Sequence, residues 1–353
     1  MPFKLNMDFS NKLITWYLQN KRNLPWREEP YPYYVWLSEI MLQQTRVDQA
    51  MPYFYKFIET FPKLQDLACA DENTVLKLWQ GLGYYSRARN IHFTAKYIIN
   101  DLNGEFPNSY HQLIKLKGIG DYTASAIASI CFNESKAVVD GNVHRVLSRY
   151  FNIETPINSS KGIKEFKELA QELIPFENPG DYNQAIMELG ATVCKPQNPA
   201  CKNCVLNDGC LALKNNKQKL LPVKENKVKI TTIHLNFIVV VSTNNKLILE
   251  KRNGKGIWKH LYQFPLIESP QEIGEEELIL HPLFISIFNN SEINIQLYNE
   301  IPIRHKLTHR NLLTKFWIIK TSNNQQLNTD WNKINEFPVP ILIANFLKQF
   351  KFD

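Results

Sequence analysis

Four of the six cysteines in this chain are grouped near its middle, which is the first feature with chemical meaning. They fall within 17 positions in the pattern C-x6-C-x2-C-x5-C, at Cys194, Cys201, Cys204 and Cys210. Disulfides are uncommon in a reducing cytosol, so this spacing predicts a metal site. Four thiolates from one short loop hold either a zinc ion or an iron–sulfur cluster, and spacing alone does not separate the two. The other cysteines, Cys69 and Cys131, stand in apolar segments and are expected to be small buried side chains.

A carboxylate set in an apolar run is the second such feature. Glu39 lies within VWLSEIMLQQT, where most of its neighbours are apolar. Burial disfavours the ionised form of a carboxyl group, which keeps a proton available near neutral pH for general acid catalysis. A glutamate in a helix is more usually a solvated surface residue, but the apolar neighbours of Glu39 argue against that interpretation.

A glycine pair precedes a second candidate carboxylate. Gly118 and Gly120 in LKGIGDYTASA predict a tight turn that leads into a helix starting near Asp121. Backbone N–H groups at such a turn can bind a phosphate without reading a base. Taken alone, the pair is also typical of a plain helix–helix turn. About twenty residues later the segment VDGNVHRV contains Asp140, which makes the combination more specific.

These residues must be positioned by a mainly helical N-terminal region. From Asp8 to about Leu213, apolar residues recur at three- and four-residue intervals, with Gly and Pro in the gaps and no convincing strand. Residues 214–230 are rich in Lys, Asn and Gln and are interpreted as a linker. Beyond it, Thr231–Ser242, Lys246–Glu250 and Phe316–Lys320 have strand character, and Pro338–Leu347 predicts a helix.

The expected fold is therefore a mainly α region, residues 1–213, followed by a smaller α+β domain, residues 231–353. A length of 353 residues is consistent with two domains. The net charge of +7 mildly favours a polyanionic partner. No stretch has the apolar length of a signal peptide or a membrane span, so a cytoplasmic protein is expected.

The cysteine pattern and the hairpin resemble the endonuclease III-like superfamily of helix–hairpin–helix glycosylases. The pattern follows MELGATVC directly, as it does in that superfamily. The resemblance implies a [4Fe–4S] cluster at residues 194–210, with Lys195 and Lys202 near phosphates, and a helix–hairpin–helix element near residues 113–126. It also implies that Asp140 faces the sugar of an extruded nucleotide.

Three segments sharpen the resemblance to the MutY family of adenine glycosylases: LPWR at 24–27, PYYVWLSEIMLQQT at 32–45 and LWQGLGYYSRARN at 78–90. Cleavage of an N-glycosidic bond requires one acid to protonate the leaving base and a second carboxylate to stabilise the cationic sugar. The resemblance assigns the first role to Glu39, at adenine N7, and the second to Asp140, with Asn142 beside it and Tyr122 against the sugar. It places Trp26 and Arg27 in the adenine pocket. The DNA contacts that we expect on the same basis are Gln43, Gln44, Leu82, Tyr84, Lys117, Gly118 and Gly120.

Tyr122 indicates the type of reaction. In the strand-cleaving branch of the superfamily, the corresponding position carries a lysine that forms a Schiff base. Lys117 stands before the first glycine and is interpreted as a backbone contact rather than a nucleophile. Base removal without efficient strand cleavage is therefore expected.

The C-terminal region resembles the Nudix-like recognition domain of the same family, through residues 251–265 and 304–309. The family loop that contacts 8-oxoguanine usually reads Phe-Ser-His, whereas this chain has Leu307, Thr308 and His309. The acidic run EIGEEE at 272–277 lacks the order of a Nudix hydrolase motif, so no nucleoside diphosphate hydrolysis is expected. An alternative is that this domain only enlarges the DNA interface.

The leading hypothesis is a monofunctional glycosylase that acts on double-stranded DNA containing adenine opposite 8-oxoguanine or guanine. Such an enzyme is expected to be monomeric and, in a bacterial-type cell, associated with the nucleoid through DNA. Two alternatives remain at this point: an endonuclease III-like glycosylase/lyase for oxidised pyrimidines, and a non-catalytic DNA-binding iron–sulfur protein.

Overall fold

The computed structural model describes residues 3–225, 230–289, 291–322 and 326–350, and the chain divides into two compact units. The first unit comprises residues 1–69 and 90–226, and the second comprises residues 70–89 and 227–353. Part of the predicted linker, residues 226–229, lies outside the described residues. The predicted domain boundaries at 213 and 231 remain predictions, because the compact units are drawn differently: residues 70–89 group with the C-terminal part.

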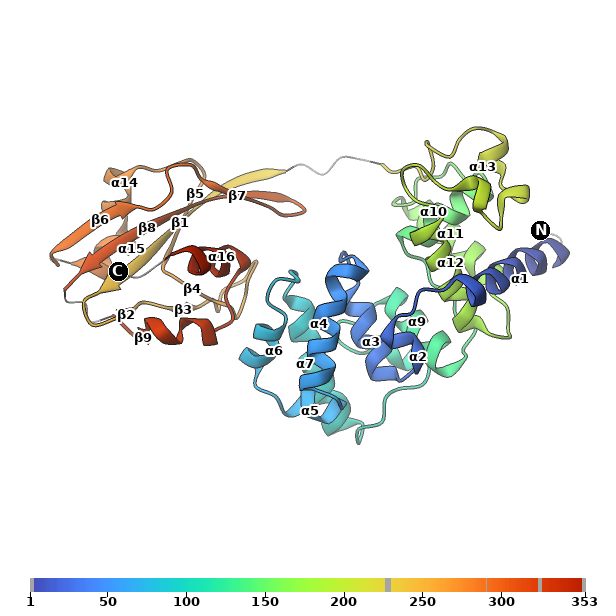
Figure 1. Cartoon of the computed structure of the whole chain (residues 1–353), viewed down its shortest axis with the longest axis horizontal. Helices are drawn as coiled ribbons and strands as arrows, with labels where there is room; N and C mark the ends of the chain where they lie inside the picture. Colours follow the sequence, from blue (N-terminus) through green and yellow to red (C-terminus); the bar gives the residue numbers. More distant parts are fainter. Residues whose placement is uncertain (1–2, 226–229, 290, 323–325, 351–353) are drawn as a thin grey trace. The chain divides into compact units, whose positions relative to one another are not determined.

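The described chain before residue 230 is helical and contains no strand, as predicted (Figure 1). Short 3-10 turns at Cys201–Asn203 and Asn207–Gly209 shape the cysteine loop. The α-helices of this part are α1 (Phe3–Asn20), α2 (Pro25–Glu28), α3 (Pro32–Met41), α4 (Val47–Thr60), α5 (Leu64–Cys69), α6 (Glu72–Leu78), α7 (Ser86–Asp101), α8 (Tyr110–Leu113), α9 (Asp121–Phe132), α10 (Gly141–Tyr150), α11 (Ser160–Leu173), α12 (Pro179–Thr192) and α13 (Leu211–Lys214). None of the helices in the described residues combines the length and the apolar character that a bilayer crossing requires.

Local sequence explains where the helices of the first unit begin and end. Asp140 caps α10, because its side chain accepts hydrogen bonds from the N–H groups of Asn142 and Val143. Pro179 occupies the first turn of α12, where its missing N–H costs nothing. Asn133 ends α9 in the left-handed conformation, with φ of 55°.

The core of the first unit joins helices that are far apart in the sequence. Leu13 and Tyr17 from α1 are fully buried against Leu147 from α10 and Leu189 from α12. Cys194 and Cys204 are partly buried at the edge of this same core. The cysteine loop is therefore anchored to the packing of α10 and α12.

A five-stranded sheet organises the second unit (Figure 1). Its strands are β1 (Thr231–Ser242), β5 (Leu266–Ser269), β6 (Ile293–Leu297), β7 (Ile303–Lys306) and β8 (Arg310–Thr321). The central pair, β1 and β8, is parallel, with Thr231 opposite Arg310 and Ser242 opposite Thr321. Strand β5 lies on the other side of β1, whereas β6 and β7 both pair with β8 at its two ends.

Both faces of this sheet are covered, which explains the long apolar run of β1. Ile238 and Trp317 pack on one face with Phe284 of α15. On the other face, Phe316 stacks on Phe346 of α16 with ring centroids 4.2 Å apart. The remaining elements are β2 (Lys246–Leu247), β3 (Glu250–Lys251), β4 (Tyr262–Gln263), β9 (Thr329–Asp330), α14 (Glu275–Ile279), α15 (Pro282–Phe288), the 3-10 turn Trp331–Glu336 and α16 (Ile341–Gln349).

The sequence-based elements are confirmed with changes of detail. Thr231–Ser242 is a strand and Phe316–Lys320 lies within β8, but the predicted strand Lys246–Glu250 is divided between β2 and β3. The helix predicted at Pro338–Leu347 begins at Ile341, after Pro340. The expectation for Cys69 was wrong: this side chain is exposed, because it ends α5 on the side opposite the buried Leu67. Cys131 is partly rather than fully buried.

Candidate active site and cysteine loop

An open cleft of about 1320 Å³ in the first unit collects most of the predicted catalytic residues. It is formed by residues from α2, α3, α9, α10 and α12 and by the segments that adjoin them. The predicted residues in its lining are Trp26, Arg27, Glu39, Gln43, Gln44, Tyr122, Asp140 and Asn142. The sequence therefore identified side chains that the fold brings together from positions up to 116 residues apart.

Glu39 projects from α3 and is buried, as the apolar run predicted; only 7% of the residue is exposed. The pKa of its carboxyl group is raised to about 7, chiefly by burial and also by the nearby charge of Asp140, against the opposing effects of a hydrogen bond from Tyr122 and the charge of Arg27. A carboxyl group with this pKa holds a proton and can release it near neutral pH. Glu39 thus has the properties of a general acid.

Tyr122 on α9 fixes the position of the Glu39 carboxyl group. Its hydroxyl donates a hydrogen bond to Glu39 Oε2 at 2.6 Å and lies 3.1 Å from the sulfur of Met187. Burial, together with the charge of Glu39, holds the pKa of the tyrosine well above its usual value. Tyr122 therefore stays protonated and acts here as a donor.

Asp140 lies in a polar setting, although it is also largely enclosed. Its Oδ1 accepts hydrogen bonds from the backbone N–H groups of Asn142 and Val143, both at 2.8 Å, and its Oδ2 accepts one from Asn142 Nδ2 at 2.8 Å. Burial raises the pKa of Asp140 above its ordinary value, while these hydrogen bonds and the charge of Arg145 oppose the rise. Three N–H donors thus support the ionised carboxylate.

Two arginines and a buried glutamate form one wall of the cleft. Glu188 on α12 is 1% exposed and receives Arg22 Nε at 2.6 Å on Oε1. Arg22 Nη2 and Arg27 Nη2 both reach its Oε2 at 2.9 Å. Burial would raise the pKa of Glu188, but the two guanidinium groups hold it below its ordinary value. The wall therefore carries a fixed carboxylate and two oriented donors.

The predicted hairpin lies outside the lining of this cleft. Gly118 has φ of +82°, and a Cβ atom added there would lie 2.6 Å from the Cβ of Asn90, so only glycine fits. The Thr94 hydroxyl donates to the Lys117 carbonyl at 2.7 Å, which fixes the turn against α7. Helix α9 begins directly after Gly120, as predicted.

The remaining predicted DNA contacts belong to the second unit. Leu82 is buried, whereas Tyr84 is 48% exposed. Leu307, Thr308 and His309 form the short loop between β7 and β8, closed by a hydrogen bond from the Leu307 N–H to the Arg310 carbonyl at 2.8 Å. The hydroxyl groups of Tyr84 and Thr308 are hydrogen-bonded to each other at 2.7 Å. Two residues chosen for separate DNA roles therefore lie side by side.

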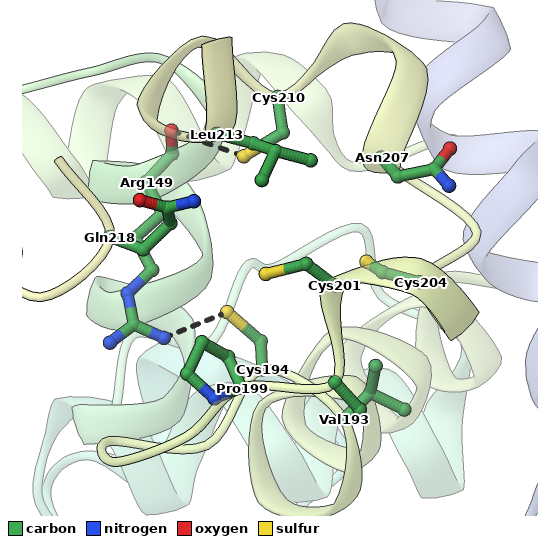
Figure 2. A pocket seen from close by; sticks show the side chains of 11 residues that line it. Arg149, Val193, Cys194, Pro199, Cys201, Cys204, Asn207, Cys210, Leu213 and Gln218 are labelled. Atoms are coloured by element: carbon green, nitrogen blue, oxygen red, sulfur yellow. Dashed lines mark hydrogen bonds between the residues drawn. The ribbon is translucent and has the colours of Figure 1, made fainter. Parts of the chain in front are cut away.

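The four clustered cysteines surround a single small cavity (Figure 2). Apolar side chains such as Val193 and Leu213 also line this cavity. Burial raises the pKa of the Cys204 thiol to about 11. Among the described residues, no three His, Cys, Asp or Glu side chains converge as the ligands of a single ion would. The four cysteines line the cavity instead.

Two arginines on successive turns of α10 hold the loop that carries these cysteines. Arg149 donates to the sulfur of Cys194 at 3.3 Å (Figure 2). It also donates to the carbonyls of Lys195 and Pro196 at 2.8 and 3.1 Å. Arg145 Nε donates to the Cys194 carbonyl at 2.6 Å, and its Nη2 donates to Asn142 Oδ1 at 2.7 Å. The cysteine loop and the residues around Asp140 are thus parts of one hydrogen-bonded structure.

The sequence reasoning missed four of the residues just described: Arg22, Arg145, Arg149 and Glu188. Glu188 carried a usable signal, because it lies in AIMELG, an apolar setting much like that of Glu39. The three arginines carried none, since the partners that define them, a carboxylate, a backbone carbonyl and a sulfur, lie 45 to 166 residues away in the sequence.

Comparison with protein families matches residues 37–176 to the HhH-GPD superfamily of base excision DNA repair proteins. Residues 236–349 match the NUDIX domain. These two matches correspond to the helical region and to the sheet-containing region of the chain.

Curated relatives match over lengths that range from the helical region to nearly the whole chain. The adenine DNA glycosylase of Buchnera aphidicola subsp. Baizongia pistaciae is 37% identical over 355 residues, covering 97% of this chain and 97% of that protein. The protein of the same name from Homo sapiens is 44% identical over 222 residues, covering 60% of this chain and 41% of that protein.

Solved structures resemble the helical part. A thermostable thymine-DNA glycosylase superposes with a TM-score of 0.55 at 28% identity, covering 60% of this chain and 98% of that one. Endonuclease III in a non-covalent DNA complex gives a TM-score of 0.53 at 22% identity, covering 62% and 100%. At this identity, the similarity to endonuclease III shows a shared fold.

Proposed function

This chain belongs to the adenine DNA glycosylase family, and from that premise we propose that it removes adenine opposite 8-oxoguanine or guanine in double-stranded DNA. It is a monofunctional N-glycosylase of base excision repair, and its product is an abasic site. The observation that carries the mechanism is the pairing of Glu39 and Asp140 in one cleft with different surroundings.

Glu39 is the general acid. A proton on its carboxyl group passes to N7 of the extruded adenine, which makes the base a better leaving group. With a pKa of about 7, Glu39 is about half protonated at neutral pH, so the proton is available and is also easily released. The hydrogen bond from Tyr122 orients the carboxyl group for this transfer.

Asp140 stabilises the positive charge that develops on the sugar as the glycosidic bond breaks. Its three N–H donors are already in place, so the carboxylate needs no rearrangement in the transition state. Water then completes the hydrolysis at the anomeric carbon.

The absence of an amine at position 122 determines how the reaction ends. A lyase uses a lysine amine to form a Schiff base with the sugar before the strand is cut. Tyr122 cannot form one, and its hydroxyl is occupied by Glu39. Base removal therefore leaves the strand intact.

Base recognition uses the wall formed by Arg22, Arg27 and Glu188, with Trp26 beside it. The buried Glu188 carboxylate orients the two guanidinium groups, whose N–H donors can bind the acceptor atoms on the edge of a purine. The hairpin at Gly118 and Gly120 holds a backbone phosphate through its N–H groups. Gln44 and Tyr84 wedge into the duplex beside the lesion, and Gln43 contacts the DNA next to them. Leu82 is buried and packs nearby.

The loop Leu307–Thr308–His309 reads the base opposite the adenine. Thr308 and His309 are exposed and present a hydroxyl and an imidazole, both of which can hydrogen-bond to 8-oxoguanine. The bond between Thr308 and Tyr84 supports this proposal, because it joins the residue that opens the duplex to the one that reads the orphaned base.

The cavity between Cys194, Cys201, Cys204 and Cys210 fits a [4Fe–4S] cluster, since four thiolates are its usual ligand set. When bound, the cluster would link the four cysteines through its bonds to their thiolates and so hold the loop in one conformation. Arg149, which donates to the sulfur of Cys194, would balance part of the negative charge of the thiolates. Lys195 and Lys202 project from this loop as phosphate contacts.

The proposal is tested on a duplex with adenine opposite 8-oxoguanine, with strand nicks scored before and after alkali. Adenine release with nicks only after alkali is the expected result, and the same duplex with cytosine opposite the lesion is the control. Nicks without alkali would favour a lyase and direct attention to Lys117. Tight binding without release would favour a non-catalytic DNA-binding protein.

The cofactor is tested separately, by metal and sulfide analysis of the purified protein. We expect about four irons and four acid-labile sulfides per chain and a brown colour. One zinc per chain in a colourless protein would contradict the cluster assignment and restore the zinc alternative.

A further inference from the structure

The start of α9 carries an acidic side chain where the proposed function requires a phosphate to approach. Asp121 is the first residue of the helix and follows Gly120 of the hairpin directly. A carboxylate at this position stabilises the helix through its dipole. It also repels a phosphate that approaches the same N–H groups. The negative charge of Asp121 therefore favours folding of α9 but opposes the binding of a DNA phosphate at the same position.

Two neighbouring elements provide a partner for this carboxylate. Lys167 on α11 donates to Asp121 Oδ1 at 2.7 Å, and the Tyr110 hydroxyl on α8 donates to the same oxygen. Lys136 lies over the ring of Tyr110, with its Nζ 4.6 Å from the ring centre. Partial burial would raise the pKa of Asp121, but the hydrogen bonds from Lys167 and Tyr110 and the charges of both lysines hold it below its ordinary value. Asp121 is thus ionised and paired.

We propose that Lys167 is a positioning residue for DNA binding, which neutralises Asp121 and so allows the hairpin to accept a phosphate. This role rests on the proposed function of the hairpin and deepens it. Lys167 does not need to touch DNA to act in this way, because it removes a repulsion that belongs to the protein itself. The ion pair is half exposed, so its contribution to folding is small and its effect is expected mainly in binding.

A double-mutant cycle separates this role from direct phosphate contact. Lys167→Ala is expected to weaken binding of the duplex about threefold to tenfold at low salt, and less at high salt, where the repulsion is screened. Asp121→Asn should bind at least as tightly as the wild-type chain. In the Asp121→Asn background, Lys167→Ala should change affinity by less than about twofold, because the charge that it balanced is gone.

Lys164→Ala is the matched control. Lys164 lies on the same helix, is 77% exposed and pairs only loosely with Glu168 at 3.8 Å. This variant removes the same charge from α11 and should change affinity by less than about twofold. Lys164→Ala should also leave adenine release unchanged, and thermal unfolding of each variant verifies that the chain is folded.

Two results would overturn the inference. An equal loss of affinity from Lys167→Ala with and without Asp121→Asn would make Lys167 a direct phosphate contact. Wild-type affinity in the single variant would show that the pairing has no role in binding. A wild-type protein that releases no adenine would instead count against the proposed function, so the two failures are distinguishable.

Discussion

The buried end of α3 and the N-terminal cap of α10 each present one carboxylate to the same cleft, but the surroundings of the two carboxylates differ. Around Glu39 the surroundings are apolar, and the only hydrogen bond described for its carboxyl group comes from Tyr122. Around Asp140 the backbone of a helix start provides two N–H groups and Asn142 provides a third. One site favours the neutral acid and the other supports the anion.

The difference shows that burial alone does not determine the charge of a carboxyl group. Both groups are largely enclosed, and burial is the first cause of the raised pKa of each. The pKa of Glu39 rises to about 7 with a single hydrogen bond opposing the rise, whereas three N–H donors oppose it at Asp140. The two proposed roles thus rest on hydrogen-bond donors that are more numerous at one site than at the other.

The largest expected effect comes from removing the acid. Glu39→Gln should lower the rate of adenine release about 10³-fold, because the amide cannot deliver a proton, while duplex affinity stays within about threefold.

Asp140→Asn should lower the rate of adenine release about 10²-fold. It should also move the pH dependence that Glu39 gives the reaction to lower pH, since the charge that raises the pKa of Glu39 is lost. Single-turnover kinetics from pH 5 to 9 measure both, with the exposed Glu168→Gln as control. Equal pH profiles in the wild type and Asp140→Asn would contradict the coupling of the two groups.

An intermediate effect is expected from the donor that holds Glu39. Tyr122→Phe removes a hydrogen bond that lowers the pKa of Glu39, so the decline of activity with rising pH should begin at a higher pH than in the wild type. The rate at low pH should fall about tenfold, because the carboxyl group loses its orientation. The pH–rate profile of this variant is the measurement. A shift to lower pH would show that the bond does not favour the ionised form.

The smallest effect concerns stability rather than rate. A carboxyl group whose pKa is raised from 4.5 to about 7 by folding stabilises the protein fully below pH 4.5 and loses that contribution as pH rises through 7. Glu39→Gln should therefore gain about 2 kcal/mol in free energy of unfolding relative to the wild type between pH 5 and pH 8. Urea unfolding of the two proteins at both pH values checks this. A constant difference between them would mean that Glu39 is not held neutral by the fold.

The sequence predicted the catalytic side chains of the cleft better than the residues that hold them in position. Glu39 was identified by its apolar neighbours, and the cysteines by their spacing, because both signals are local. Glu188 could have been found in the same way as Glu39. Arg145 and Arg22 could not, since a surface arginine and one that bridges two elements look alike until the helices are packed.

The strand pairing of the second unit was also difficult to predict, because it depends on contacts between residues that are far apart in the sequence. Strand character was visible in Thr231–Ser242, but its parallel partner is Arg310–Thr321, almost eighty residues later. Pairing over that separation depends on the whole sheet and leaves no local pattern. The short strands β4, β6 and β7 were not predicted, because strands of two to five residues carry little periodicity.

The three-residue loop at the end of β7 and β8 has a consequence for how this protein can change over generations. Thr308 and His309 are exposed and take no part in either core of the sheet, so replacing them costs little stability. The long strand β8, in contrast, is fixed by partners on both sides. Under the proposed role of this loop, single substitutions at Thr308 and His309 would change the preference for the opposing base while the scaffold stays intact.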